Sequence, residues 1–239
     1  MATERRGARE WDSTIERRGL RDRVYERILQ LLLSGEVEPG ARLSIDTIAR
    51  QLDVSPTPVR EAMVHLERTG LVTREALKGY RMAPPLGAAQ LRELFDARLM
   101  LEVEAVRLAA AAGDDMLTEL REAEEHHRSA GERVIEAFHA GRNDVDLATA
   151  YYAADAAFHE VLFRYCGNRY LRQMSESLGA QLHRMRQIMR HGATDVREAI
   201  AEHEAICDAF ASEDPDAPAR MMRLHIEHVR ARSLDLARD

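Results

Sequence analysis

The stretch that decides the fold covers residues 34–83 and reads SGEVEPGARLSIDTIARQLDVSPTPVREAMVHLERTGLVTREALKGYRMA. Its pattern predicts a helix capped by Ser44, a tight turn at Asp53, and another helix capped by Ser55. Pro56 suits the first position of that second helix, because the N–H that proline lacks has no intrahelical acceptor there. With an apolar helix upstream, the stretch predicts a helix-turn-helix motif.

The helix that follows Ser55 separates into two faces at 100° per residue. One face is apolar and predicts packing against the other helices, through Val59, Ala62, Met63 and Leu66. The opposite face carries Thr57 and Arg60 near the helix N-terminus, where a recognition helix contacts bases and phosphates. Arg60 is the strongest candidate, as a bidentate partner of a guanine edge or a phosphate. Ser55 and Thr57 are expected to donate hydrogen bonds to phosphate, assisted by the helix dipole.

A hairpin is predicted after this helix, with strands at residues 71–74 and 79–82. Lys78 and Gly79 lie at its tip, which suits entry into a minor groove, and Lys78 is the only lysine of the chain. The motif with its hairpin therefore predicts a winged helix-turn-helix domain that binds double-stranded DNA.

This stretch resembles the winged-helix domain of GntR-family transcription regulators, whose pattern includes V-S-R-T-P-V-R-E-A-L, L-E-x-x-G-L-V and a Gly-tipped wing. Here VSPTPVREAM, LERTGLV and the Lys78-Gly79 tip match that pattern. Pro56 replaces an arginine that is frequent after V-S, so more of the DNA contact is expected to fall on Arg60. The resemblance also implies that Arg42 and Arg50 contact the DNA backbone.

The rest of the chain is expected to be helical. Pro84 and Pro85 form a stiff connector, because neither can continue a helix interior. We therefore expect a mostly α protein: a flexible arm (1–18), the winged helix-turn-helix domain (19–83), a linker (84–87), and an all-helical domain (88–239). Short polar turns divide this last domain into an antiparallel bundle, with helices expected at about 87–112, 115–140, 144–166, 168–191, 195–211 and 215–235.

Composition sets limits on location and partners. The net charge of −7 argues against nucleic acid when taken for the whole chain, but residues 1–85 hold 15 basic against 13 acidic side chains, so the acidic excess lies in the second domain. No apolar run is long enough to cross a bilayer, and the polar opening MATERRGARE is not expected to act as a secretory signal. The two cysteines cannot form a disulfide framework. We expect a cytoplasmic protein without a membrane partner.

Four residues stand out on the apolar faces of the expected bundle. Asp155 and His159 are four residues apart and so project from one side of a helix, while His203 and His225 lie on apolar stripes of two other helices. A lone histidine on such a stripe is usually a core residue, but three of them with a carboxylate form a donor set for Zn²⁺, Ni²⁺, Mn²⁺ or Fe²⁺, with zinc favoured. Other donors are close in sequence and are interpreted as surface or packing groups, namely Cys207, His228, His126 and His127.

The second domain resembles the FCD domain of the FadR subgroup of GntR regulators. The matching segments are LFDARLMLE (94–102), DAAFH (155–159), EHEAI (202–206) and MMRLH (221–225). The resemblance implies that Asp155, His159, His203 and His225 bind a metal ion and that a small organic acid binds beside it. A buried anion needs a fixed cation. Arg98 is our choice for that cation, with Arg184 or Arg186 as a second contact.

Together these features predict a homodimeric transcription regulator, expected to be a repressor, which binds a palindromic operator and responds to a sugar acid, hydroxy acid or dicarboxylate. Two alternatives remain. In one, the metal ion is itself the signal and no organic effector exists. In the other, the chain is a helical metalloenzyme with a DNA-binding tether, although no Glu-x-x-His pair, nucleophile elbow or phosphate loop supports catalysis.

Overall fold

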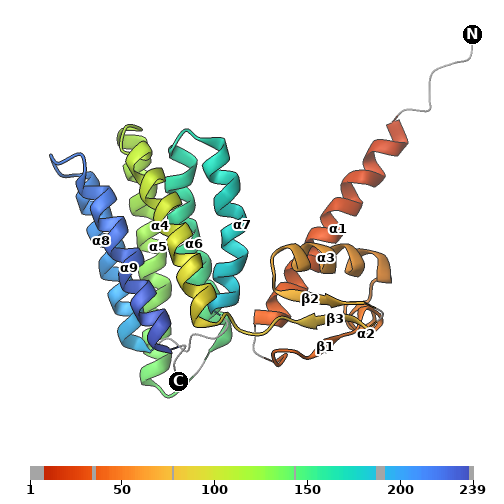
Figure 1. Cartoon of the computed structure of the whole chain (residues 1–239). Coiled ribbons are helices and arrows are strands. Elements are labelled where there is room, and N and C mark those ends of the chain that lie inside the picture. Colours follow the sequence, from red (N-terminus) through yellow and green to blue (C-terminus); the bar gives the residue numbers. More distant parts are fainter. Residues whose placement is uncertain (1–7, 34–35, 77, 143, 187–191, 237–239) are drawn as a thin grey trace, which may run out of the picture. The chain divides into compact units, whose positions relative to one another are not determined.

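The computed structural model describes residues 8–33, 36–76, 78–142, 144–186 and 192–236. The chain divides into two compact units, Met1–Pro84 and Pro85–Asp239, so the division falls between the two adjacent prolines. Figure 1 shows the elements of each unit, a small mixed domain and a helical bundle. The predicted class, a winged helix-turn-helix domain followed by an all-α bundle, is confirmed.

The first unit contains the helices α1 (Ala8–Leu33), α2 (Ile45–Gln51) and α3 (Pro56–Arg68). Ser44 caps α2 as predicted, because its hydroxyl accepts a hydrogen bond from the backbone N–H of Thr47. The turn between α2 and α3 places Asp53 at φ 52°, in the left-handed region that aspartate tolerates better than most residues. The predicted packing faces are buried and build one core, to which α1 contributes Val24, Ile28 and Leu32 and α3 contributes Val59, Ala62, Met63 and Leu66.

The wing contains one more strand than the sequence predicts. The expected hairpin is present as β2 (Val72–Glu75) and β3 (Gly79–Met82), and β1 (Arg42–Leu43) pairs with the other edge of β3, so the antiparallel sheet has the order β1-β3-β2. A strand of two residues is too short to show alternation in a sequence. Gly79 has φ 89°, which explains why glycine follows the wing tip.

The expectation of a flexible arm over residues 1–18 differs from the structure. Helix α1 begins at Ala8, so residues 8–18 are helical, whereas residues 1–7 lie outside the described part of the chain. The expectation was based on polarity, but alanine, arginine and glutamate favour helix, and no proline occurs before Pro39. Polarity in this segment is therefore not a sign that helix is absent.

The second unit is the predicted bundle. Its helices are α4 (Ala88–Ala109), α5 (Asp114–His139), α6 (Val145–Tyr165), α7 (Arg169–Arg186), α8 (Ala193–Phe210) and α9 (Ala217–Leu236). The polar turns do cap helices: the side chains of Asp144 and Asn168 accept hydrogen bonds from the first turns of α6 and α7. Helix α5 packs on α6 and α8, and α4 packs on α6 and α9. The core between them includes Phe95, Leu120, Phe158, Ile206 and Met222.

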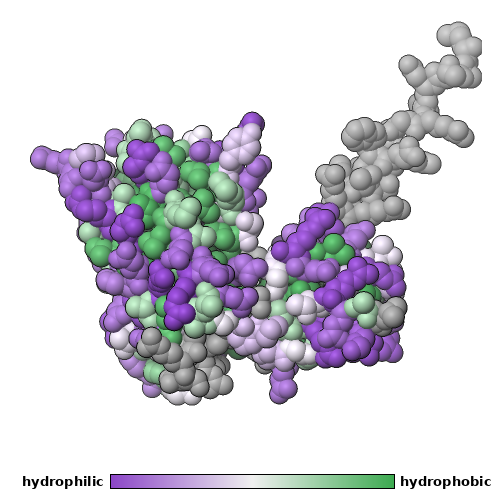
Figure 2. Space-filling model, viewed as in Figure 1, coloured by the Kyte–Doolittle hydropathy of each residue, from purple (hydrophilic) through white to green (hydrophobic). Residues whose placement is uncertain are grey.

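The surfaces of the two units differ. The visible face of the first unit is mostly hydrophilic, whereas apolar residues reach the visible surface of the bundle in several places (Figure 2). Large exposed apolar side chains of the bundle include Met100, Phe138 and Tyr170. Within the described residues, no helix combines the length and apolar content needed to cross a membrane.

Candidate functional site

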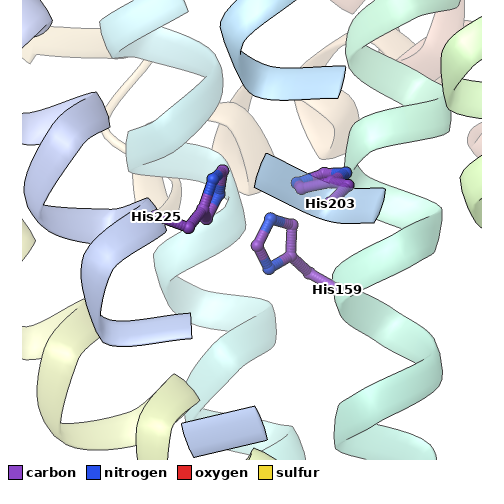
Figure 3. Close-up of side chains that lie close together, drawn as sticks. All are labelled: His159, His203 and His225. Atoms are coloured by element: carbon purple, nitrogen blue, oxygen red, sulfur yellow. The ribbon is translucent and has the colours of Figure 1, made fainter. Parts of the chain in front are cut away.

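Three histidines from three helices meet inside the bundle. His159 projects from α6, His203 from α8 and His225 from α9, and Figure 3 shows their rings grouped together. Each of them offers a ring nitrogen that lies within 4.8 Å of the other two. All three side chains are buried, and His203 is fully so. The site therefore lies in the interior, although its donors are far apart in sequence.

Asp155 lies beside these histidines. One turn before His159 on α6, it brings its Oδ1 to 3.9 Å from His159 Nε2 and 3.7 Å from His203 Nε2. The four residues proposed from the sequence thus lie in one region: His159, His203 and His225 form one group of donors, and Asp155 lies within 4 Å of His159 and His203. The i,i+4 spacing on α6 brings Asp155 next to His159, and the packing of α6, α8 and α9 brings His203 and His225 to them.

The chemistry of this cluster fits a divalent metal ion. Both ring nitrogens of His203 are buried and make no hydrogen bond within the described residues. A buried polar atom without a partner is costly, and it is a common mark of a missing ion or water. Burial lowers the pKa of His203 well below its usual value, and nearby His127 and His225 lower it further. His203 is therefore neutral near pH 7, which is the form that binds metals.

One more histidine lies in this region of the bundle. His127 of α5, interpreted as a surface or packing group, has no exposed surface, and its Nε2 lies 3.9 Å from Asp155 Oδ1. Its ring lies 4.4 Å from the ring of His203. A signal was present in the sequence, because Leu120 and His127 are seven residues apart and so share the buried face of α5.

Two glutamates lie against the outer nitrogens of the histidines, and neither is among the site residues predicted from the sequence. Glu102 Oε2 of α4 lies 2.7 Å from His159 Nδ1, and Glu202 Oε2 of α8 lies 2.8 Å from His225 Nδ1. Burial alone would raise the pKa of Glu202, but hydrogen bonds from His225 and Arg232 lower it to about 2. A carboxylate on one ring nitrogen fixes the tautomer and leaves the other nitrogen for a ligand.

Arg98, proposed as the cation for an organic acid, is buried beside the cluster. Its Nε donates to Glu102 Oε1 at 2.6 Å, so its charge is already paired. Burial alone would raise the pKa of Glu102, but Arg98 and His159 hold it far below its usual range. The side chains of Arg184 and Arg186, proposed as second contacts, lie outside the described residues.

A pocket opens beside the cluster, with about 470 Å³ of unfilled space including the part that opens to solvent. Arg98, Asp155 and His225 form part of its wall, together with Tyr151, Tyr152, Asp195 and Arg232. Arg232 is engaged with Glu202, through Nη1 at 2.8 Å and Nη2 at 3.0 Å. The pocket thus joins the histidine cluster to arginines that already bind carboxylates.

The other donors considered in the sequence lie in different surroundings. His126 is exposed, and His228 is largely exposed with its Nδ1 3.0 Å from Glu202 Oε1. Cys207 is buried in the apolar core, and burial raises the pKa of its thiol to about 12. A protonated thiol is a poor metal ligand, because the thiolate is the binding form.

The candidate DNA-binding side chains lie at the N-terminal part of α3, where Ser55, Thr57 and Arg60 are exposed. Ser55 occupies the N-cap position but makes no side-chain cap hydrogen bond, contrary to the sequence prediction. The reason is local, because Pro58 occupies the third helical position and has no N–H to donate. The Ser55 hydroxyl therefore makes no capping hydrogen bond to the first turn of α3.

The remaining candidates lie around this helix. Arg50 is exposed at the end of α2, and Lys78 and Gly79 are exposed at the wing tip, where Lys78 Nζ lies 3.9 Å from Glu75 Oε2. Arg42 of β1 is exposed and pairs in register with Arg81 of β3. Like charges at directly opposite sheet positions repel each other. Arg81 is compensated by Glu75, whose Oε1 lies 2.9 Å from Arg81 Nε.

Comparisons with known proteins identify both domains of the chain. Residues 20–81 match the family described as bacterial regulatory proteins, gntR family, and residues 93–228 match the FCD domain. The uncharacterized HTH-type transcriptional regulator BphR of Paraburkholderia xenovorans (strain LB400) is 28% identical over 212 residues, covering 88% of this chain and 83% of BphR.

Two Escherichia coli proteins are also similar. The HTH-type transcriptional repressor GlaR of strain K12 is 29% identical over 206 residues, covering 84% of this chain and 90% of GlaR. The solved structure of E. coli McbR/YncC superposes with a TM-score of 0.71 at 23% identity, covering 89% of this chain and 95% of the other, and this likeness concerns the fold. The chain therefore belongs to the GntR family of bacterial transcriptional regulators and combines its DNA-binding domain with an FCD domain.

Proposed function

We propose that this GntR-family regulator is a homodimeric repressor whose FCD domain holds a divalent metal ion, with zinc favoured, and responds to a small organic acid bound next to it. The observation that carries this proposal is the convergence of Asp155, His159, His203 and His225 in the buried interior, next to a pocket. Three imidazoles and one carboxylate match the preferences of such an ion.

The residues around the cluster prepare it for an ion. Glu102 lies against Nδ1 of His159, and Glu202 lies against Nδ1 of His225, so Nε2 of each ring is the nitrogen that can bind an ion. Aromatic packing fixes His203, whose ring stacks on Phe158 at 4.0 Å. An ion bound to this set would supply an electrophilic centre with open positions for a ligand carboxylate.

The organic acid is proposed to occupy the pocket beside the cluster. Arg98 and Arg232 lie in its wall, and both already bind glutamates. An incoming carboxylate would therefore bind chiefly at the ion, with the arginines assisting through their remaining N–H groups. Tyr151, Tyr152 and Asp195 also line the pocket, and they favour a ligand that carries hydroxyl groups, such as a sugar acid or a hydroxy acid.

Dimerisation and repression complete the proposal. A homodimer presents two copies of α3 to two half-sites of a palindrome. The exposed apolar side chains of the bundle, among them Met100 and Tyr170, suit a surface buried between two subunits. Repression is supported by similarity to GlaR, a repressor that is 29% identical.

Thermal melting of chelator-stripped protein with added Zn²⁺ tests the metal site. A ligand that binds only the folded state raises the melting temperature. We expect a rise for wild type and for His126→Gln, whose side chain is exposed, and a smaller rise for His159→Gln, which loses one of the proposed ligands. Gluconate, lactate and succinate added to Zn²⁺-loaded protein then test the effector, read out as operator affinity in a mobility-shift titration. No rise with Zn²⁺, or an equal rise in His159→Gln, would refute the proposed site.

A second candidate function is a metal-responsive regulator with no organic effector. The observation that favours it is the engagement of Arg98 and Arg232 with glutamates, since pairing weakens both arginines as anion receptors. It predicts that Zn²⁺ alone changes operator affinity and that none of the three acids changes it further. The same titration therefore separates the two functions.

A further inference from the structure

The buried histidine His127 has a position that packing alone does not explain. No part of it is exposed, and it lies between Tyr151, whose ring stacks on it at 4.8 Å, and the ring of His203. Its Nε2 lies as close to Asp155 Oδ1, at 3.9 Å, as does Nε2 of His159. One carboxylate oxygen therefore faces nitrogens of His127, His159 and His203 at similar distances.

The donors form two overlapping groups. His159, His203 and His225 form one, and His127, Asp155 and His203 form the other, with the donor atoms of each group within 4.8 Å of one another. Among the described residues, no such group joins His127 to His159 or to His225. Two ligand atoms that each lie about 2.1 Å from one ion are at most about 4.2 Å apart. A single ion position thus cannot use all the donors.

We propose that His127, Asp155 and His203 form a second position for the metal ion, next to the one formed by His159, His203 and His225. Both positions use His203, and Asp155 is the one carboxylate among their donors, so two divalent ions would repel each other strongly across a short distance. The positions are therefore alternatives for one ion. This inference rests on the metal site of the proposed function and adds a ligand to it.

The second position has a structural consequence, because it involves a different helix. The first position connects α6, α8 and α9, whereas the second connects α5, α6 and α8. Gly131 allows α5 to lie this close, since a Cβ there would be 2.7 Å from Ile200 Cδ1 and 3.0 Å from Val196 Cγ1. Movement of the ion between the positions would exchange a link to α9 for a link to α5.

The test is a double-mutant cycle on metal binding in the full chain. His225→Leu removes a donor that belongs to the first position alone, and His127→Phe removes a donor that belongs to the second alone while keeping an aromatic ring against Tyr151. His126→Phe makes the same chemical change one residue away, at an exposed position, and is the matched control. Bound Zn²⁺ per chain, affinity by chelator competition, and the visible spectrum of bound Co²⁺ are measured for each variant.

We expect one ion per chain in wild type and in His225→Leu, with a changed Co²⁺ spectrum and an affinity weaker by about 10-fold to 100-fold in the latter. Adding His127→Phe to His225→Leu should abolish binding, whereas adding His126→Phe should change nothing. If the His225→Leu/His127→Phe double variant binds Zn²⁺ as tightly as His225→Leu alone, the second position is overturned. It is also overturned if His225→Leu has a native circular dichroism spectrum and binds no Zn²⁺. If His225→Leu does not fold, His159→Gln replaces it in the same cycle. Absence of binding in wild type overturns both this inference and the metal site of the proposed function.

Discussion

Arg98 and Glu102 form a buried ion pair, in which Nε lies 2.6 Å from Oε1 and the two side chains are only 4% and 6% exposed. They are four residues apart on α4, so the helix itself sets their approach. Glu102 also contacts His159, and the pair therefore connects the first helix of the bundle to the histidine cluster. Any ligand that recruits Arg98 must share it with this carboxylate.

Replacement of Glu102 should be strongly destabilising. Glu102→Gln keeps the size of the side chain but leaves the Arg98 charge unpaired in the interior, and loss of one partner of a buried pair costs about 3–5 kcal/mol. Chemical unfolding of metal-free protein measures this change. Glu104→Gln, which breaks the exposed pair with Arg107, is the matched control and should cost much less, because solvent screens an exposed pair. Equal effects of the two substitutions would contradict the assigned role of Glu102.

Arg60 should dominate DNA binding. It is exposed near the N-terminus of α3, whereas Arg68 is exposed at the opposite end of the same helix. Arg60→Ala should weaken operator binding by about 1–3 kcal/mol or more and leave the oligomeric state unchanged, while Arg68→Ala should have a much smaller effect. Mobility-shift titration and size-exclusion chromatography check these outcomes. Wild-type operator affinity in Arg60→Ala would refute the assignment.

A methyl group at Gly131 should disturb the contact of α5 with α8. The nearest atoms to such a Cβ include Val196 Cγ1, which belongs to a stiff β-branched side chain. We expect Gly131→Ala to lower the free energy of unfolding by about 1–3 kcal/mol through overpacking. Gly179→Ala, at a helical glycine with open space around it, should instead raise it by about 0.5–1 kcal/mol. A gain of stability in both variants would show that α5 and α8 can separate at little cost.

Stability should fall in alkaline solution because of Cys207. The thiol ionises at about pH 9 in the unfolded chain, whereas burial raises its pKa to about 12 in the folded one. Ionisation therefore stabilises only the unfolded state, and the stability present below pH 9 is lost as the pH rises from about 9 to 12. Urea unfolding at pH 8 and pH 10 should show a smaller loss for Cys207→Ala than for wild type. An unchanged loss would assign the effect to other groups.

The sequence predicted most of the fold for identifiable reasons. Ser44, Pro56 and Pro84 mark helix starts and the division between the units, and regular apolar spacing identifies the buried faces of α3 and of the bundle helices. The strand β1 was missed because two residues carry no pattern. The helix over residues 8–18 was not predicted, because a polar composition does not distinguish a helix from a flexible arm.

The candidate site was predicted only in part. Asp155 and His159 are linked by their spacing on one helix, but the approach of His127 to Asp155 depends on how α5 packs, which one sequence does not specify. The i,i+4 spacing of Arg98 and Glu102 is itself a signal of their ion pair, although Arg98 was predicted only as a partner for a ligand. The failed cap at Ser55 was also predictable from Pro58.

The state of His203 has a consequence for the cohesion of the whole bundle. A buried ring whose two nitrogens lack hydrogen bonds is a point of local frustration, since the unfolded chain would satisfy both of them with water. An ion coordinated there would bond to a His203 nitrogen and cross-link the helices that meet at the centre of the domain. Exchange of backbone amide hydrogens in α8 should accordingly slow on loading with Zn²⁺, because the ion would oppose local opening of the helices that it links.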